Sequence, residues 1–136
     1  MKKLFAILLI TACSTPHNEE LYADSAEIHK VATKTGAEVG QKIKRMNSFL
    51  GALEESALKD SISTLKQDFI DWEKSIVEVP GLESDNHDHH DHNHSHDHDH
   101  APPPDLTPEM MLDVQKSMRD QIDELNIRAE NLLRTL

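Results

Sequence analysis

Cysteine is almost absent from this 136-residue sequence, in which Cys13 is the only one. A single cysteine excludes disulfide bonds within the chain and metal sites built from several thiolates. Aromatic residues make up only 4% of the chain, and there are only four glycines and six prolines. This composition is typical of a small helical domain with a modest hydrophobic core.

Motifs for catalysis are also missing. The sequence contains no Gly-x-Ser-x-Gly, no glycine-rich phosphate-binding loop and no His-Glu-x-x-His. The acidic pairs at positions 19–20 and 54–55 are interpreted as solvated side chains. We therefore predict that the protein is not an enzyme.

Basic residues are outnumbered, because 14 Lys and Arg stand against 25 Asp and Glu, giving a formal net charge of −11. An acidic chain argues against nucleic acid as a partner and against binding to anionic lipid through the protein surface. It is compatible with binding of cations. We expect metal ions, and no nucleic acid, among the partners.

The N-terminus has the parts of a targeting signal. Lys2 and Lys3 form a basic region, and Leu4–Ile10 is an apolar core too short to span a membrane as a mature helix. The next residues, Ile10–Cys13 (ITAC), resemble a bacterial lipobox, in which the cysteine is lipidated and becomes the first residue of the mature chain. We predict a lipoprotein signal peptide at residues 1–12.

The lipobox resemblance implies that Cys13 carries the lipid and that residues 13–18 form a short tether. Ser14 follows the cysteine, and in enteric lipoproteins the lack of Asp at this position implies sorting to the outer membrane. We expect a protein of the bacterial cell envelope that faces the periplasm and contacts the membrane through its lipid anchor. The alternative is an ordinary signal-peptidase site with an incidental cysteine.

A histidine-rich stretch at residues 85–100 (DNHDHHDHNHSHDHDH) dominates the second half of the chain. It contains no apolar residue, so it has nothing to bury that would offset the entropy of ordering it, and we expect a disordered loop. Imidazole is a common ligand of zinc, copper(II) and nickel, and aspartate adds oxygen ligands. The candidate metal ligands are His87, His89, His90, His92, His94, His96, His98, His100, Asp88, Asp91, Asp97 and Asp99.

Alternating histidines on a flexible chain allow many overlapping ligand sets, so we predict several labile, poorly selective sites. The Irving–Williams order makes copper(II) the tightest ion in vitro. Protons compete with metal for imidazole near its ordinary pKa, so binding should depend on pH. The alternative is that the stretch is a charged spacer whose metal binding is incidental.

Apolar and small residues recur every three or four positions over three segments, which predicts three amphipathic helices. In the first, about residues 19–53, they are Ile28, Ala32, Thr35, Val39, Ile43, Met46, Leu50 and Leu53. In the second, about residues 57–77, they are Leu58, Ile62, Leu65, Phe69, Trp72 and Ile76. In the third, within residues 105–136, they are Met111, Val114, Met118, Ile122, Leu125, Ala129, Leu132 and Leu136.

Turn and capping signals separate these segments. The first two form a helical hairpin at residues 19–80 that ends at Val79-Pro80-Gly81, and Thr107 and Pro108 predict the start of the third helix. A short turn and a long polar loop at residues 81–104 favour an all-α fold: an antiparallel, coiled-coil-like three-helix bundle. Its narrow apolar stripes leave homo-oligomerisation open.

Several residues within the predicted helices have more than one interpretation. Gly36 and Gly40 share a helix face and would allow close approach of a neighbouring helix. No Glu-x-x-His motif gives His29 a carboxylate partner, so we interpret it as a surface or half-buried histidine. Phe69 and Trp72 are interpreted as core residues. The methionines Met46, Met110, Met111 and Met118 lack the dense spacing of a copper(I) site and are also interpreted as packing residues.

Three segments resemble a group of small helical lipoproteins of Bacteroidetes, some of which carry the label "viral A-type inclusion protein". The segments are AEIHKV at 26–31, DWEKSIVEVPG at 71–81 and DLTPEMMLDVQKSM at 105–118. This resemblance implies a helical lipoprotein and brings no activity with it. Residues 106–109 (LTPE) are similar to the LTxxQ signature of periplasmic stress and zinc-resistance chaperones, with Met110 in place of the glutamine.

Loops rich in His and Asp, similar to residues 85–100, occur in zinc-uptake solute-binding proteins, and this similarity makes zinc the first candidate metal. The sequence thus predicts a lipid-anchored periplasmic protein that buffers, senses or delivers zinc, copper or nickel. The alternative is a structural or chaperone-like envelope lipoprotein that binds a protein partner through its apolar stripes, with the loop as a spacer.

Overall fold

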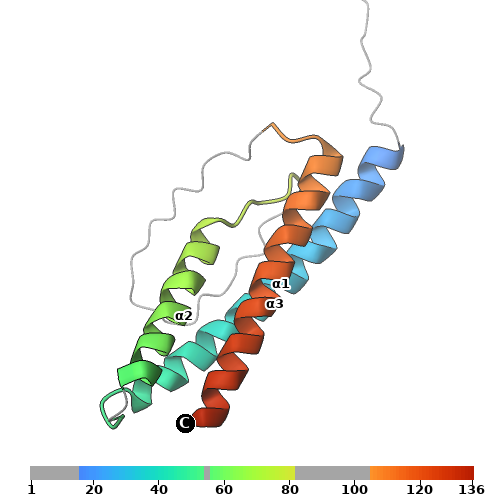
Figure 1. Cartoon of the computed structure of the whole chain (residues 1–136). Helices are drawn as coiled ribbons and strands as arrows, with labels where there is room; N and C mark the ends of the chain where they lie inside the picture. Colours follow the sequence, from blue (N-terminus) through green and yellow to red (C-terminus); the bar gives the residue numbers. More distant parts are fainter. Residues whose placement is uncertain (1–15, 54–55, 82–104) are drawn as a thin grey trace, which may run out of the picture.

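The computed structural model describes residues 16–53, 56–81 and 105–136, and these ranges contain three helices and no strand. Helix α1 spans Pro16–Phe49, α2 spans Ser56–Lys74 and α3 spans Pro108–Thr135. The helices pack as a bundle (Figure 1), which confirms the predicted all-α fold. Most of the predicted loop at 81–104 lies outside the described residues.

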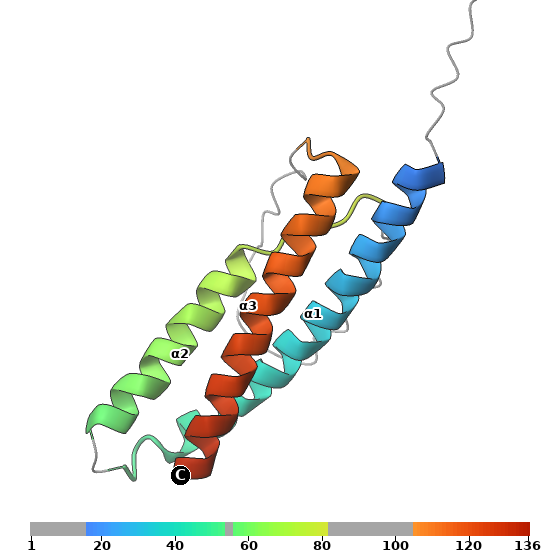
Figure 2. The ribbon, with the colours of Figure 1, turned by 45° about the vertical axis from the view of Figure 1, so that its right-hand side comes forward.

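Helices α1 and α3 run parallel, and α2 runs antiparallel to both (Figure 2). The register of side-chain contacts follows this topology. Along α1 and α3 the partner numbers rise together, from His29 with Gln115 to Lys42 with Glu130. The bundle is therefore up-down-up, with each helix antiparallel to the next in the chain.

Helix α1 is continuous over 34 residues and begins at Pro16, inside the segment predicted as a tether. It ends at Phe49, four residues before the predicted end. A turn follows, in which the backbone N–H of Ala52 donates to the Phe49 carbonyl at 3.0 Å. The chain reverses between the first two helices slightly earlier than the apolar spacing predicts.

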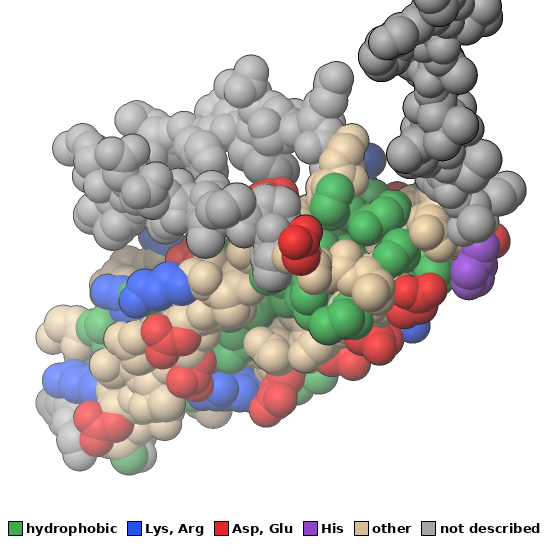
Figure 3. Space-filling model, turned by 90° about the horizontal axis from the view of Figure 1, so that it is seen from above, with side chains coloured by type: hydrophobic (Ala, Val, Ile, Leu, Met, Phe, Trp, Pro, Cys, Tyr) green, Lys and Arg blue, Asp and Glu red, His purple; other side chains and the backbone are tan. Residues whose placement is uncertain are grey.

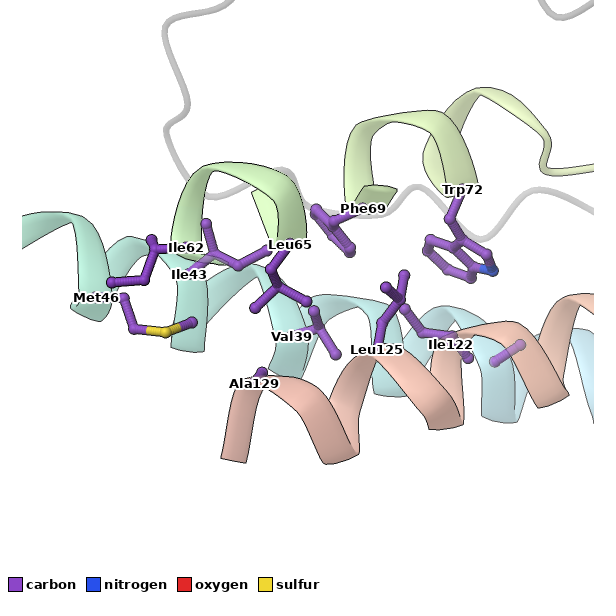
Figure 4. Close-up of a cluster of buried hydrophobic side chains, with 11 residues drawn as sticks. Val39, Ile43, Met46, Ile62, Leu65, Phe69, Trp72, Ile122, Leu125 and Ala129 are labelled. Atoms are coloured by element: carbon purple, nitrogen blue, oxygen red, sulfur yellow. The ribbon is translucent and has the colours of Figure 1, made fainter. Parts of the chain in front are cut away.

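The hydrophobic core runs along the contact line of the three helices (Figure 4). The stripe predicted for the second helix is confirmed, since its four central members are buried and Leu58 and Ile76 pack partly buried against them. The core residues are Ala32, Val39, Ile43, Met46, Ile62, Leu65, Phe69, Trp72, Ile122, Leu125 and Ala129. The apolar faces of all three helices are thus directed at one another.

Close approach of α1 and α2 depends on Gly36, whereas Gly40, the other glycine of the predicted pair, has room for a Cβ at ordinary van der Waals distance. A Cβ atom at Gly36 would lie 2.6 Å from the Trp72 ring, and one at Gly40 would lie 3.5 Å from Phe69. The two aromatic rings stack with centroids 5.9 Å apart. The Trp72 indole N–H donates to the Met118 carbonyl on α3 at 3.0 Å. Trp72 therefore contacts both neighbouring helices, and its predicted role in the core is confirmed.

The start of α3 follows the predicted capping pattern. Thr107 has an extended backbone, and its hydroxyl accepts a hydrogen bond from the Met110 backbone N–H at 3.3 Å, with Pro108 in the first turn. Hydrogen bonds from the Glu109 backbone and from Thr107 lower the pKa of the Glu109 carboxyl below its usual value. The cap fixes where α3 begins.

The outer surface of the bundle is mixed in charge. Figure 3 shows acidic and basic side chains interspersed over one face, and hydrophobic side chains gathered toward the end where α1 begins. Between α2 and α3, the Arg128 guanidinium pairs with Asp68 at 2.7 Å. Between α1 and α3, the Lys42 ammonium pairs with Glu130 at 3.1 Å. Such half-exposed pairs contribute little stability, so the core holds the bundle together.

We predict that Gly36→Ala lowers the free energy of unfolding by about 1–2 kcal/mol, because the new methyl group meets the rigid indole ring and this outweighs the gain in helix propensity. Urea unfolding followed by circular dichroism measures the change. Gly51→Ala is the matched control, because a Cβ there meets nothing within 4 Å. Equal free energies of unfolding for the two variants would contradict the prediction and would show that the Trp72 side chain can move away from a methyl group at position 36.

Candidate functional site

The predicted metal ligands at positions 87–100, and Cys13, lie outside the described residues. The structure does describe the residues on either side of the histidine-rich stretch. These are Gly81, at the end of the segment that follows α2, and Asp105, shortly before α3. The segment that follows α2 ends, and the segment that leads into α3 begins, at the end of the bundle where α1 begins (Figures 1 and 2).

The segment after α2, residues 75–81, is held against the bundle. The sequence predicts helix as far as residue 77, but α2 ends at Lys74 and the chain continues without regular structure. Val79 is buried in this segment, and the carbonyl of Val77 accepts a hydrogen bond from the Gln115 side chain at 2.7 Å. We call residues 75–81 the stem, because they lead from α2 into the histidine-rich stretch.

A polar layer links this stem to α1 and α3. It consists of His29 on α1, Gln115 on α3 and the stem residues Val77 and Glu78. Nδ1 of His29 and Oε1 of Gln115 are 3.1 Å apart, and both residues are buried, at 5% and 0% exposure. The layer therefore joins three segments that are far apart in the sequence.

The hydrogen bonds of Gln115 determine which nitrogen of His29 carries the proton. The Val77 carbonyl can only accept, so the amide nitrogen of Gln115 faces it and the amide oxygen faces His29. Because that oxygen is also an acceptor, Nδ1 of His29 must be the donor. In the neutral ring, Nε2 is then an acceptor with a free lone pair.

Nε2 of His29 faces the carboxylate of Glu78. Its distance to Oε2 is 3.5 Å, and the Glu78 side chain is 47% exposed. The layer is thus closed on the Gln115 side and open to solvent at Glu78. It combines an imidazole nitrogen and a carboxylate oxygen, which are both ligands of divalent transition metals.

The interpretation of His29 as a surface or half-buried histidine without a carboxylate partner is wrong. The buried face of α1 follows a strict alternation of steps of four and three that includes Ser25, His29 and Gly36. The predicted stripe took Ile28 and Thr35 instead, because they are the more apolar neighbours. Continuing the regular spacing backward from Ala32 would have found His29.

Choosing the more apolar of two neighbouring residues also gave a wrong core position on α3. The predicted stripe included Val114, whereas the fully buried residue is Gln115. Regular spacing backward from Ile122 and Met118 gives Gln115 and then Met111. Glu78 had no local signal, because its proximity to His29 depends on how the stem crosses the bundle.

The prediction that the methionines are packing residues is confirmed for three of the four. Met46, Met111 and Met118 are buried, whereas Met110 is 51% exposed. Within the described ranges, no group of three or more His, Cys, Asp or Glu side chains is arranged to hold a metal ion. The described part of the chain therefore contains one His–carboxylate pair in the polar layer and no complete metal centre.

A second polar feature is a shallow hollow between α2 and α3. Its lining residues are Asp60, Ser61, Thr64, Arg128, Asn131 and Leu132. The hydroxyls of Ser61 and Thr64 donate to carbonyls within their own helix, at 2.8 and 2.9 Å. These groups are engaged in local hydrogen bonds, and the hollow brings no histidine beside them.

No family model, no curated protein and no solved structure matched the chain in comparisons with known proteins. The resemblance to helical lipoproteins accordingly stays a prediction from the sequence. No helix within the described residues has both the length and the apolar character needed to cross a membrane.

We predict that Gln115→Met destabilises the bundle by about 2–4 kcal/mol, because it keeps the side-chain volume but leaves the His29 N–H and the Val77 carbonyl without partners. In the described residues every buried side-chain polar atom has a hydrogen-bond partner, so an unpaired His29 N–H would be an exception in this structure. Urea unfolding measures the destabilisation. Gln121→Met is the control, because Gln121 is exposed and bonds to the surface hydroxyl of Ser117. A change below about 0.5 kcal/mol at Gln115 would contradict the prediction.

Proposed function

We propose that this protein is a lipid-anchored protein of the bacterial envelope that binds divalent transition-metal ions through residues 85–100. The observation that carries the proposal is the concentration of eight histidines between His87 and His100, interleaved with aspartates. Neutral imidazoles bind zinc, copper(II) and nickel, and flanking carboxylates lower the charge cost of collecting cations. Buffering, sensing and delivery of the ion are all consistent with this chemistry.

The length of the connection between α2 and α3 supports the proposal. Helices in a bundle are usually joined by about 2–8 residues, whereas residues 82–104 separate Gly81 from Asp105. The segments after α2 and before α3 lie at the same end of the bundle (Figures 1 and 2), so a much shorter connection could join the two helices. Because the connection is longer than the fold requires and is rich in histidine and aspartate, a metal-binding role for these residues is favoured over a role as a simple linker.

The described residues that follow the proposed anchor and those that flank the proposed metal-binding segment lie at the same end of the bundle. Cys13 precedes the first residue of α1 by three positions, and α1 begins at the end of the bundle where the segments after α2 and before α3 lie. If Cys13 carries a lipid, the histidine-rich segment leaves the bundle near the membrane surface. A segment in this position would bind ions close to the membrane, where a membrane protein could exchange them. It would not extend far into the periplasm.

The alternative function, protein binding through the apolar stripes, has less support. Phe69 and Trp72 are buried in the bundle's own core, together with the stripes of α1 and α3. A partner would have to use apolar side chains that remain exposed, such as Val31, Phe49 and Ile127. In the described residues the apolar stripes pack against one another and are not available to a partner. Metal binding is therefore the better-supported function.

Calorimetric titration of the soluble chain (residues 14–136) with zinc, copper(II) and nickel tests the proposal. We expect more than one ion per chain at about pH 7.4, with affinity of about micromolar or tighter, and much weaker binding at about pH 5.5 where protons occupy the imidazoles. Changing the eight histidines at positions 87–100 to Ser should remove this multi-ion binding.

The matched control changes Asp88, Asp91, Asp97 and Asp99 to Asn and keeps every histidine. We expect this variant to bind the same ions more weakly but in similar number, because imidazole supplies the main ligands. Binding no tighter than about millimolar in the unaltered chain would overturn the metal-binding function. Zinc and copper titrated side by side would rank the ions.

The anchor is tested separately. We predict that the full chain, made in a bacterial host with labelled fatty acid, incorporates the label and that Cys13→Ser abolishes incorporation, because lipid attachment needs the thiol. His17→Ser, in the first turn of α1, should keep full labelling. An unlabelled natural chain that is cleaved after residue 12 would instead indicate an ordinary signal-peptidase site.

A further inference from the structure

We infer that His29 and Glu78 form a binding site for one divalent transition-metal ion, distinct from the histidine-rich stretch and independent of the function proposed for it. The site lies in the polar layer, where α1 meets the stem of residues 75–81. Its two ligand atoms are Nε2 of His29 and Oε2 of Glu78, 3.5 Å apart.

When the His29 ring is neutral and Glu78 is ionised, the two facing atoms are both acceptors. Gln115 fixes the proton of the neutral ring on Nδ1, which leaves the Nε2 lone pair directed at a carboxylate that, when ionised, can only accept. Two acceptors facing each other repel unless a cation lies between them. The cation is either a proton on Nε2 or a metal ion bound by both atoms.

The separation of the two atoms fits a metal ion. A charge-assisted N–H···O bond brings nitrogen and oxygen to about 2.7–2.9 Å, and 3.5 Å is well beyond this. Zinc binds imidazole nitrogen and carboxylate oxygen at about 2.0–2.2 Å, so two ligands at the tetrahedral angle lie about 3.4 Å apart. The observed separation of 3.5 Å matches the spacing of two ligands of one ion.

The surroundings of His29 are those of a metal ligand. A metal-binding histidine usually donates its other ring N–H to an acceptor that holds the ring in place. Here that acceptor is the Gln115 oxygen, itself fixed because the Gln115 amide also donates to the Val77 carbonyl. His29 is 5% exposed and cannot easily turn away, whereas the half-exposed Glu78 leaves space for water to complete the coordination.

The site would join α1 to the stem. Glu78 lies three residues before Gly81, the last described residue before the histidine-rich stretch. Neighbouring Val79 is buried and Val77 is bonded to Gln115, so the stem already lies in place. With only two protein ligands, we expect a single, weak and exchangeable site with zinc as the probe ion.

The test uses the variant in which the eight histidines at positions 87–100 are Ser, so that His17 and His29 are the only histidines left. Zinc is added up to about 1 mM at constant pH, and the imidazole signals are followed by NMR. We expect the His29 ring to respond with saturation at one ion per chain, while the exposed His17 responds little.

Glu78→Gln in the same background should weaken zinc binding by more than about tenfold. This variant should fold normally, because Glu78 is half exposed and the stem is held by Val77 and Val79. Glu124→Gln, at an exposed position on α3, is the matched control and should leave zinc binding unchanged. As a second readout, zinc should raise the unfolding temperature of the parent variant and not that of Glu78→Gln.

Three results would overturn the inference: a His29 ring that does not respond to zinc, equal responses of His29 and His17, or a response that Glu78→Gln leaves unaltered. In the first case, a ring protonated on both nitrogens would identify a proton as the cation between the two residues. Because this variant lacks the eight histidines, its result is separate from the calorimetric test of residues 85–100.

Discussion

The contact of Trp72 with Gly36 is the constraint on which the bundle depends. The indole of Trp72 covers a position of α1 that has no side chain, and its N–H donates to the Met118 carbonyl of α3. One residue of the middle helix thus sets the spacing of both others. Loss of a buried tryptophan side chain typically costs about 3–5 kcal/mol, a large share of the stability of a small domain.

The polar layer of His29, Gln115 and the stem lies beyond this contact, toward the end where α1 begins. It replaces apolar packing with hydrogen bonds that are satisfied only in one register of α1 against α3. Slipping either helix would leave buried polar groups without partners, which is more costly than a change of apolar neighbours. The layer also holds the stem, and so fixes where the histidine-rich stretch leaves the bundle.

If both proposed sites bind metal, the chain combines two kinds of metal chemistry. The histidine-rich stretch offers many equivalent ligands, which favours capacity over selectivity. The His29–Glu78 pair offers two fixed ligands at the base of that stretch, where the ring is oriented by Gln115. An ion bound by His29 and Glu78 would connect α1 to the stem.

The sequence by itself determined the helices, the cap at Thr107 and the core face of α2, because these depend on residues within a few positions of each other. It also determined the histidine-rich composition of residues 85–100, on which the proposed function depends. Only the tertiary structure decided that His29 is buried and meets Gln115, 86 positions away, and Glu78. In a helix, neighbouring residues point about 100° apart, so taking Ile28 and Val114 for their apolar character turned the predicted face away from the polar residues. Which residues share a layer depends on the register between helices, and patterns within one helix do not define that register.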